Sequence, residues 1–284
     1  MHKRCHREQM NYLEEIDFNE PDFEDWHDEL PLWSAPFGLM LLDRVPIKPN
    51  ITILDVGAGT GFLSLELAQR CGPDAKVVAA DPWKPGMQRL RGKIDRLGIQ
   101  NITLIEQSAE IIDLPDDSID LIVSNLGLNN FERPAEVLET CFRVAKPGAT
   151  IFLTTNLSGH MKEFYSVYRD TLIELGHRDR LSALDEHISH RGTVESIRAL
   201  VADAGFLVQR VDTQEFRMRF ANGSSLFRHY FIRLGFMDGW KTVAPPEAIE
   251  STFKRLEQKL NHAAAKQGEL TLTIPMACLE AAKR

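Results

Sequence analysis

The sequence predicts an α/β fold, a Rossmann-like, doubly wound sheet of seven mostly parallel strands. Three observations lead to this prediction. Short apolar runs alternate with segments of helical periodicity from residue 51 to residue 213. A glycine-rich turn follows the first apolar run and opens a helical segment. One more alternating apolar stretch near the C-terminus supplies the seventh strand.

The expected strands are short runs rich in apolar residues, at 51–56, 76–80, 102–106, 119–123, 150–155, 206–213 and 270–279. The expected helices between and after them cover 62–70, 87–97, 134–144, 162–175, 193–204 and 247–266. Pro134 stands at the first position of its segment, where proline disturbs a helix least. Regular alternation of strand and helix builds a parallel sheet with helices on both faces.

Two regions lie outside this alternation. We expect residues 1–50 to form an N-terminal helical lid and residues 214–268 to form a second lid, inserted before the last strand. The core would then consist of residues 51–213 and 269–284. Both lids are rich in aromatic residues, which either pack onto the core or roof a substrate site, since loops over the carboxyl edge of a sheet commonly do both.

Charge and composition exclude several classes of protein. The 284 residues are 43% apolar and 26% charged, as in ordinary globular proteins, and the formal net charge is -8. Nucleic-acid binders display basic patches, but this chain has no block of lysine and arginine and carries an acidic run at 14–29. We therefore expect no nucleic-acid partner.

Neither a membrane segment nor a metal site is expected. No stretch approaches 18 uninterrupted apolar residues, and no apolar segment follows the basic N-terminal residues. The expected compartment is therefore the cytoplasm. The four cysteines, Cys5, Cys71, Cys141 and Cys278, are far apart and share no CxxC spacing. This pattern favours reduced structural cysteines over disulfides or a zinc site.

The glycine-rich turn reads Leu54-Asp55-Val56-Gly57-Ala58-Gly59-Thr60-Gly61. Glycine is needed where the backbone takes a positive φ or lies directly against a ligand. The helix that follows presents free N–H groups and a partial positive charge. Dinucleotide enzymes use GxGxxG spacing at this position, whereas Gly57, Gly59 and Gly61 have GxGxG spacing and are followed by Leu63 and Ser64.

This turn resembles the first motif of the class I S-adenosylmethionine-dependent methyltransferases. The resemblance runs from about residue 50 to residue 156, and within the family it is nearest to the small-molecule branch that includes ubiquinone and menaquinone methylases. It implies an enzyme that uses S-adenosylmethionine and releases S-adenosylhomocysteine. The turn from Gly57 to Gly61, with Ala58, Gly59 and Thr60, would lie against the methionine part and ribose of the cofactor.

The resemblance assigns two carboxylates to the cofactor. Asp55 would organise the turn and hold the amino group of the cofactor, often through water. Asp81, which closes the second strand, would accept hydrogen bonds from both ribose hydroxyls. The alternative for Asp81 is a helix cap ahead of Pro82. Pro82 and Trp83 would lie beside the adenine, and Trp83 would stack on it.

A third segment, which begins at Gln107, resembles the part of the family that reads the adenine. The usual acid is replaced by Ser108, whose hydroxyl can still accept from the adenine amino group but makes a weaker contact. Ala109 would donate its backbone N–H, and Glu110 is either a further contact or a surface residue. Asn125 follows the expected fourth strand and is a candidate cofactor contact, since in the family this edge faces the methyl group and the substrate.

The chemistry implied is methyl transfer to a small, partly apolar molecule, because the Asn-Pro-Pro-aromatic signature of enzymes that methylate adenine amines or glutamine is absent. In-line placement of a nucleophile behind the sulfonium methyl supplies most of what this reaction needs. His160 and His229 are candidate bases, although a structural histidine is the more ordinary interpretation. The candidate substrate contacts are Trp33, Phe37, Asn129, Tyr230 and Trp240. We expect a monomer or a homodimer.

Two other functions remain open at this point. A nicotinamide-dependent oxidoreductase shares the strand–turn–helix opening, but its glycine spacing is missing. A protein that binds S-adenosylmethionine without catalysis, as a regulator or partner subunit, is favoured by Ser108 and by the lack of a clear base, because a fold and a cofactor site do not fix function.

Overall fold

The structure is a computed structural model, and it describes residues 10–14, 28 and 32–284. The strands are β1 (Thr52–Val56), β2 (Lys76–Ala80), β3 (Ile102–Ile105), β4 (Ile119–Asn125), β5 (Ala145–Asn156), β6 (Leu207–Phe220) and β7 (Leu270–Ala282). The longer helices are α3 (Ser34–Leu42), α4 (Phe62–Cys71), α5 (Lys84–Leu97), α6 (Pro134–Val144), α7 (Lys162–Glu174), α8 (Leu181–Ser189), α9 (Val194–Asp203) and α13 (Ile249–Gln267). Three short helices, α10 (Gly223–Arg228), α11 (Tyr230–Gly235) and α12 (Met237–Val243), follow β6.

The seven strands form one sheet, as the sequence predicts, and their order in it is β3-β2-β1-β4-β5-β7-β6. The first five strands in this order pair in parallel, and β7 pairs antiparallel with β5. The chain reverses its direction of winding between β1 and β4. In such sheets ligands bind beyond the carboxyl ends of the strands at this reversal. The topology therefore places the candidate site at the ends of β1, β2 and β4.

The structure divides into two compact units. The sheet unit contains the described residues among 28, 32–157, 192–214 and 276–284, and the helical unit contains those among 10–14, 158–191 and 215–275. The division differs from the expected one in two places. Residues 32–50 group with the sheet, and residues 158–191, expected in the core, group with the inserted region. Residues 214–220, expected to begin a lid, extend β6.

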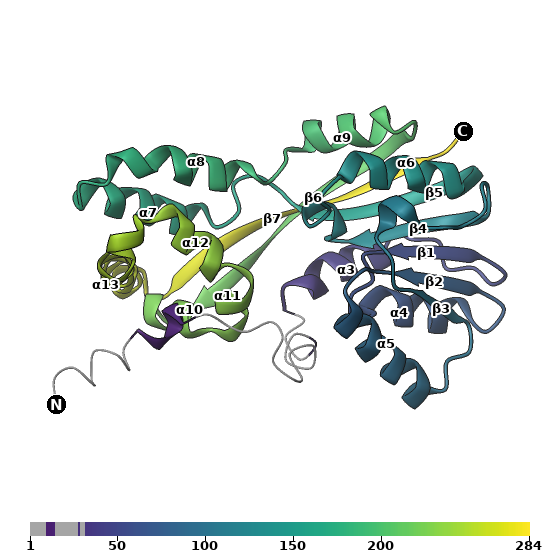
Figure 1. The fold of residues 1–284 in the computed structure, drawn as a ribbon, viewed down its shortest axis with the longest axis horizontal. Helices are drawn as coiled ribbons and strands as arrows, with labels where there is room; N and C mark the ends of the chain where they lie inside the picture. Colours follow the sequence, from purple (N-terminus) through teal and green to yellow (C-terminus); the bar gives the residue numbers. More distant parts are fainter. Residues whose placement is uncertain (1–9, 15–27, 29–31) are drawn as a thin grey trace. The chain divides into compact units, whose positions relative to one another are not determined.

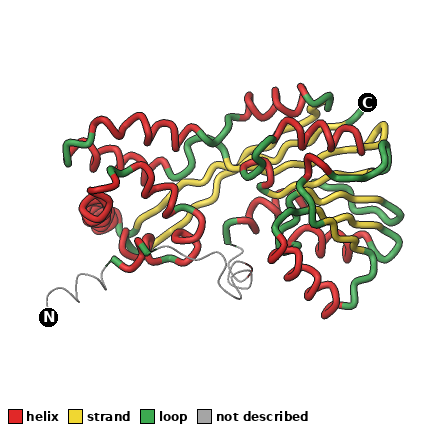
Figure 2. The backbone as a smooth tube through the Cα atoms, in the orientation of Figure 1, coloured by secondary structure: helices red, strands yellow, loops and turns green. Residues whose placement is uncertain are grey.

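Helices cover both faces of the sheet unit, with α4 and α5 on one face and α6 and α9 on the other (Figure 1). Alternate residues of a strand point to opposite faces. Leu54 and Val56 accordingly pack in one cluster with the apolar residues of α6 and α9. Asp55, between them, points to the α4 side. Figure 2 shows the same alternation of strand and helix along the tube.

The N-terminal helix α3 packs directly on the sheet unit. Phe37 is fully buried, and α3 contacts β4 and β5. A Cβ on Gly38 would lie 2.2 Å from Cε1 of Phe62, so glycine allows α3 to approach the first residue of α4 closely. Cys5 and most of the acidic run 14–29 lie outside the described residues.

The helical unit has an aromatic core of its own. Trp240 stacks on Phe164 with 3.9 Å between ring centroids, and the hydroxyl of Tyr168 donates to the carbonyl of Trp240 at 2.8 Å. Tyr168 also meets Phe253 of α13 edge to face. These contacts join α7 to α12 and α13, which explains why residues 158–191 belong with the inserted region. In the part of the chain that is described, no helix has both the length and the apolar character needed to span a bilayer.

Candidate functional site

The glycine turn joins β1 to α4 and is tied to the neighbouring strand. Gly57, Gly59 and Gly61 have φ angles of 75°, 54° and 89°, which side chains rarely adopt. The N–H of Gly57 donates to the carbonyl of Ala80 at 2.9 Å, and that of Gly61 donates to Ala58 at 2.8 Å. A Cβ on Gly61 would lie 2.1 Å from Leu90, so this glycine is required by the fold itself.

Gly59 differs from Gly61 in what surrounds it. A Cβ built on Gly59 would meet no protein atom within 4 Å, so the turn presents bare backbone there. Gly61 is the N-cap of α4, and no side chain caps this helix. Uncapped N–H groups at a helix start favour an anionic group such as the carboxylate of an amino acid. Bare backbone beside a helix N-terminus fits the methionine part of S-adenosylmethionine.

Asp55 lies beneath the turn. Its side chain is 1% exposed and accepts a hydrogen bond of 2.6 Å from the hydroxyl of Ser64 in the first turn of α4. Burial, with a smaller contribution from the charge of Asp81, raises the pKa of Asp55 to about 7. The bond to Ser64 fastens β1 to α4, which is the organising role that the resemblance implies. Contact with the cofactor amino group stays a prediction.

We expect the carboxyl of Asp55 to make folding depend on pH in an unusual direction. Between about pH 4 and pH 7 the folded protein keeps a proton that the unfolded chain releases, so this group lowers stability as the pH rises. Asp55→Asn removes the titration while keeping an oxygen for Ser64. The stability of the variant relative to the wild type, measured by urea unfolding, should improve from pH 5 to pH 8 by roughly 3 kcal/mol, because about two pH units below the folded pKa contribute about 1.4 kcal/mol each.

Asp120→Asn provides the control for this measurement. Asp120 lies on β4 and accepts from the ammonium of Lys146 and the backbone N–H of Thr52, contacts that hold its pKa below the usual range. Asp120 is charged in the folded and in the unfolded protein above pH 5. The stability change caused by Asp120→Asn should therefore stay constant across that range. If the difference in unfolding free energy between Asp55→Asn and the wild type is also constant from pH 5 to pH 8, the pKa of Asp55 is not raised.

Asp81 joins the turn after β1 to the turn after β2. Its Oδ2 accepts from the N–H of Gly59 and its Oδ1 from the N–H of Trp83, both at 2.8 Å. The two segments that should share the ribose are therefore in direct contact. Burial raises the pKa of Asp81, against the effect of these two N–H groups. Each carboxylate oxygen can accept more than one hydrogen bond, so ribose hydroxyls fit this donor–acceptor arrangement.

Trp83 is positioned by the helix that it precedes. A Cβ on Gly86 of α5 would lie 2.2 Å from Cε3 of Trp83, so the indole packs on bare helix backbone. Trp83 is the N-cap of α5, and this helix has no side-chain cap. Asp81 therefore does not cap α5 in the usual way. Its carboxylate accepts from the backbone N–H of the N-cap residue Trp83 and not from an N–H of the first turn. Pro82 is exposed beside it.

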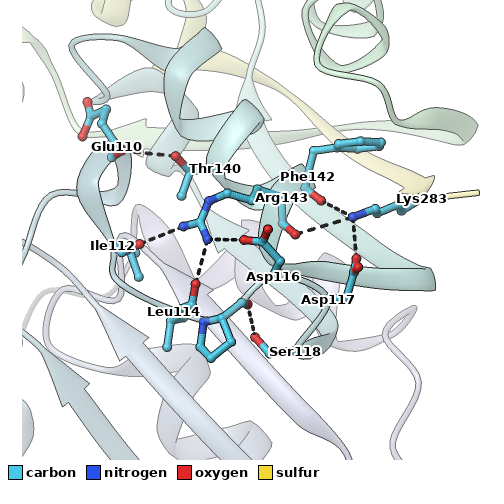
Figure 3. Close-up of polar contacts among 11 residues, drawn as sticks. Glu110, Ile112, Leu114, Asp116, Asp117, Ser118, Thr140, Phe142, Arg143 and Lys283 are labelled. Atoms are coloured by element: carbon cyan, nitrogen blue, oxygen red, sulfur yellow. Dashed lines mark hydrogen bonds and ion pairs between the residues drawn. The ribbon is translucent and has the colours of Figure 1, made fainter.

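The segment expected to read the adenine is held in place by residues of α6 (Figure 3). The guanidinium of Arg143 donates to the carbonyls of Ile112 and Leu114 at 2.9 Å and 2.7 Å. The hydroxyl of Thr140 donates to the carbonyl of Glu110 at 3.2 Å. Thr140 and Arg143 were not predicted from the sequence, because a basic residue in the last turn of a helix has an ordinary explanation in the helix dipole.

Ser108, which stands where the family usually has an acid, is paired with a carboxylate in the structure. The hydroxyl of Ser108 donates a hydrogen bond to the carboxylate of Glu110, whose side chain points away from Arg143 (Figure 3). Ala109, between them, is buried. A carboxylate is thus present two residues after the position where the family carries its acid. The pairing also leaves the lone pairs of the Ser108 oxygen able to accept a hydrogen bond.

The end of β4 forms a polar cluster with the end of β5. The amide of Asn125 donates to the carbonyl of Ser34 at 3.0 Å, and its oxygen accepts from Thr154 at 2.6 Å. Asn129 bonds to both Thr155 and Asn156. The contributions of β5 were missed, since nothing in the spacing of its threonines marks them. Leu126, between these groups, has a φ of 65°, a strained value for leucine.

Gly127 brings the turn after β4 against the glycine turn. A Cβ on Gly57 would lie 3.5 Å from Cα of Gly127, and a Cβ on Gly127 would lie 2.3 Å from Oγ of Ser124. Ser124 in turn donates to the carbonyl of Val56 at 2.6 Å. Ser124 and Gly127 lie at the edge that the resemblance places at the methyl group and the substrate, although neither was expected to contact the cofactor. A glycine and a serine just after an apolar strand were the available signal.

The remaining predicted residues fall in different units. Trp33, Phe37 and Asn129 belong to the sheet unit with the cofactor candidates, and the rings of Trp33 and Phe37 are 5.8 Å apart. His160, His229, Tyr230 and Trp240 belong to the helical unit. His160 is 3% exposed and Trp240 is fully buried in the aromatic core. A substrate pocket built from both groups stays a prediction.

Comparison with known families gives a match to most of the sheet unit. The family described as "Methyltransferase domain" matches residues 47–214, more than half of the chain. The match begins just before β1 and ends in β6. It therefore contains the glycine turn, Asp81 and the polar cluster at the ends of β4 and β5.

Individual relatives agree with this match. The chain is 26% identical over 175 residues to the ubiquinone/menaquinone biosynthesis C-methyltransferase UbiE of Salmonella arizonae. The aligned region covers 58% of this chain and 70% of that protein. In fold the chain resembles the YcgJ protein of Bacillus subtilis, with a TM-score of 0.57 and 15% sequence identity. The superposition covers 88% of this chain and 98% of that one. It also resembles an S-adenosylmethionine-dependent methyltransferase of Aquifex aeolicus, with a TM-score of 0.52 and 22% sequence identity. That superposition covers 68% of this chain and 91% of the other.

Proposed function

Because the chain belongs to the class I S-adenosylmethionine-dependent methyltransferases, we propose that it transfers the sulfonium methyl to a small, partly apolar molecule by in-line attack. The observation that carries the proposal is the carboxylate of Asp81, which holds the N–H of Gly59 at 2.8 Å beside the glycine turn. That contact brings together the residues expected at the ribose and at the methionine part.

The small-molecule assignment rests on charge and on relatives. The formal charge of -8 disfavours polyanionic acceptors, because nucleic acids are bound through basic patches. The UbiE relative is named for ubiquinone and menaquinone biosynthesis, where the acceptor is a small molecule. A C-methylation of that kind is one form of the proposed reaction. We propose the cytoplasm as the compartment; the three described cysteines are free and buried.

When bound, S-adenosylmethionine supplies a methyl group that is already electrophilic. The chain then has to orient the donor and exclude water, and proximity effects of this type supply about 7–11 kcal/mol in favourable systems. We assign the donor's carboxylate to the start of α4, its ribose to Asp81 and its adenine to Trp83 and Ala109. The pair formed by Ser108 and Glu110 would accept from the adenine amino group.

Calorimetric titration with S-adenosylhomocysteine is the direct test of this proposal. We expect saturable binding to one site per chain and displacement by S-adenosylmethionine. Ligand at about 1 mM detects binding free energies as weak as about -4 kcal/mol. No heat at that concentration with either ligand, from protein shown to be folded by circular dichroism, would rule out the cofactor assignment.

A donor-binding protein without catalysis is the second candidate function. Ser108 is the feature that favours it, since the family's usual acid is absent at that position. The carboxylate of Glu110 beside Ser108 weakens this argument. Transfer of a labelled methyl group to any quinol or phenol acceptor would exclude the silent protein. Tight donor binding without transfer to a broad acceptor set would favour it.

A further inference from the structure

The helical unit contains a cluster of polar side chains around one buried tyrosine. The hydroxyl of Tyr165 on α7 lies 3.4 Å from Nε2 of His160 and 3.3 Å from Nε2 of His187 on α8. It also accepts from the indole N–H of Trp240 on α12 at 3.3 Å. Arg191 follows α8 and acts electrostatically on the histidines. All five residues belong to the helical unit.

The hydrogen-bonding capacity of Tyr165 is fully used by these neighbours. A tyrosine hydroxyl donates one hydrogen bond and accepts about two. The indole of Trp240 takes one acceptor position, so the O–H and the remaining lone pair serve one histidine each. Nδ1 of His160 has no partner in the described part of the chain, although the residue is only 3% exposed. A buried polar atom without a partner lowers stability unless something else binds to it.

Arg191 also carries a buried polar atom without a partner. Its Nε is inaccessible and has no hydrogen-bond partner among the described residues. The interactions that shift its pKa come from burial and from Tyr165, and no carboxylate contributes. Burial, with smaller contributions from the charges of Arg191 and His187, lowers the pKa of His160 to about 3. In the described part of the helical unit, the cluster therefore combines hydrogen-bond donors with a cation and lacks an acid of its own.

We propose that this cluster binds the carboxylate of a small molecule with an aromatic or apolar body. A planar guanidinium pairs with a carboxylate through two parallel hydrogen bonds, which makes arginine the usual residue at such sites. Phe236 supplies an apolar wall, since its ring lies 5.7 Å from that of Trp240 and 6.4 Å from that of His160. His187 and Arg191 are half-buried, so the cluster reaches solvent on their side.

The position of His187 is fixed by a glycine on the neighbouring helix. A Cβ on Gly239 of α12 would lie 2.9 Å from Cε1 of His187. Cε1 of the imidazole therefore packs against bare backbone, and the ring is also 5.8 Å from that of Tyr165. A side chain held on two sides keeps its hydrogen-bonding atoms in place before a ligand arrives, which favours binding.

Titration of the folded full-length protein with benzoate and with benzamide, both in the absence of S-adenosylmethionine, tests the site. The two probes share the ring but differ in charge. We expect benzoate to bind at least about tenfold more tightly, because hydrogen bonds between ionised partners are the stronger ones. Equal binding of the two probes, or preference for inorganic phosphate over benzoate, would overturn the proposal. The result does not depend on donor binding or methyl transfer.

Arg191→Gln should lower the affinity for benzoate about tenfold or more and leave benzamide unchanged. Arg178→Gln is the matched control, since Arg178 is an exposed arginine of the same unit and loses the same charge. Equal effects of the two substitutions would contradict the assignment. If Arg191→Gln does not fold, Arg191→Lys keeps the charge and removes the fork of parallel donors. The proposal then requires a weaker selectivity for benzoate over benzamide in that variant.

Discussion

Replacing Asp81 with alanine is expected to lower the affinity for S-adenosylmethionine by about 10- to 150-fold. The estimate corresponds to the loss of hydrogen bonds to a charged group, about 1.5–3 kcal/mol. Two losses combine in this variant. The ribose hydroxyls lose a carboxylate acceptor, and the N–H groups of Gly59 and Trp83 lose the group that aligns them. Calorimetry with S-adenosylhomocysteine measures the combined effect.

Asp120→Ala is the matched control for this variant. Asp120 also accepts a backbone N–H, but it lies near the start of β4, at the opposite edge of the sheet from the carboxyl ends. Its loss should lower stability without changing donor affinity. An Asp81→Ala protein that binds the donor as tightly as the Asp120→Ala protein would show that the ribose lies elsewhere.

Asp81 and Asp55 are also linked through charge. The carboxylate of Asp81 contributes to the raised pKa of Asp55, although burial contributes more. Removing Asp81 should therefore lower the pKa of Asp55 and shrink the pH dependence that Asp55→Asn abolishes. The two carboxylates thus belong to one electrostatic group at the carboxyl edge. We therefore expect ribose binding at Asp81 to alter the protonation of Asp55.

The parts of the fold that the sequence predicts are those determined by local patterns. Each of the seven strands was expected within a few residues, except that β5, β6 and β7 are longer than their apolar runs. The meeting of Gly59 and Asp81 was expected as well, although 22 residues separate them. It follows from topology, because β1 and β2 are parallel neighbours and their carboxyl ends share an edge.

Contacts between distant segments were not predicted. Tyr165 meets His187 across 22 residues and Trp240 across 75 residues, and no local pattern announces either contact. The assignment of α7 to the helical unit depends on such contacts, since its apolar face suits a sheet as well as another helix. Arg143 presents the same difficulty, because the carbonyls that it binds lie 29 and 31 residues away.

A different limit applies to Trp240. The sequence marks it as an aromatic residue in an insertion, which fits both a substrate wall and a core residue. In the structure its ring is fully buried between Phe164 and Phe236, and its indole N–H is bonded to Tyr165. Composition alone cannot separate these outcomes, because a large amphipathic ring fits either environment. Burial and partners decide between them.

Gly59→Ala should separate donor binding from stability. The residue has a φ of 54°, so alanine is strained there by about 1–2 kcal/mol, but its Cβ would meet no protein atom within 4 Å. The methyl group would instead occupy space assigned to the donor. Forcing an extra methyl into a fitted contact costs about 1–3 kcal/mol, so the affinity should fall by about 5- to 150-fold. The fold should survive.

Gly98→Ala supplies the comparison that makes this result interpretable. Gly98 ends α5 with a φ of 66°, and a Cβ there would also meet nothing within 4 Å. Both variants should therefore lose similar stability in urea unfolding, because the strain is of one kind. They should differ in calorimetry, where Gly98→Ala binds like the wild type. Equal donor affinities in the two variants would mean that the bare backbone at Gly59 does not contact the cofactor.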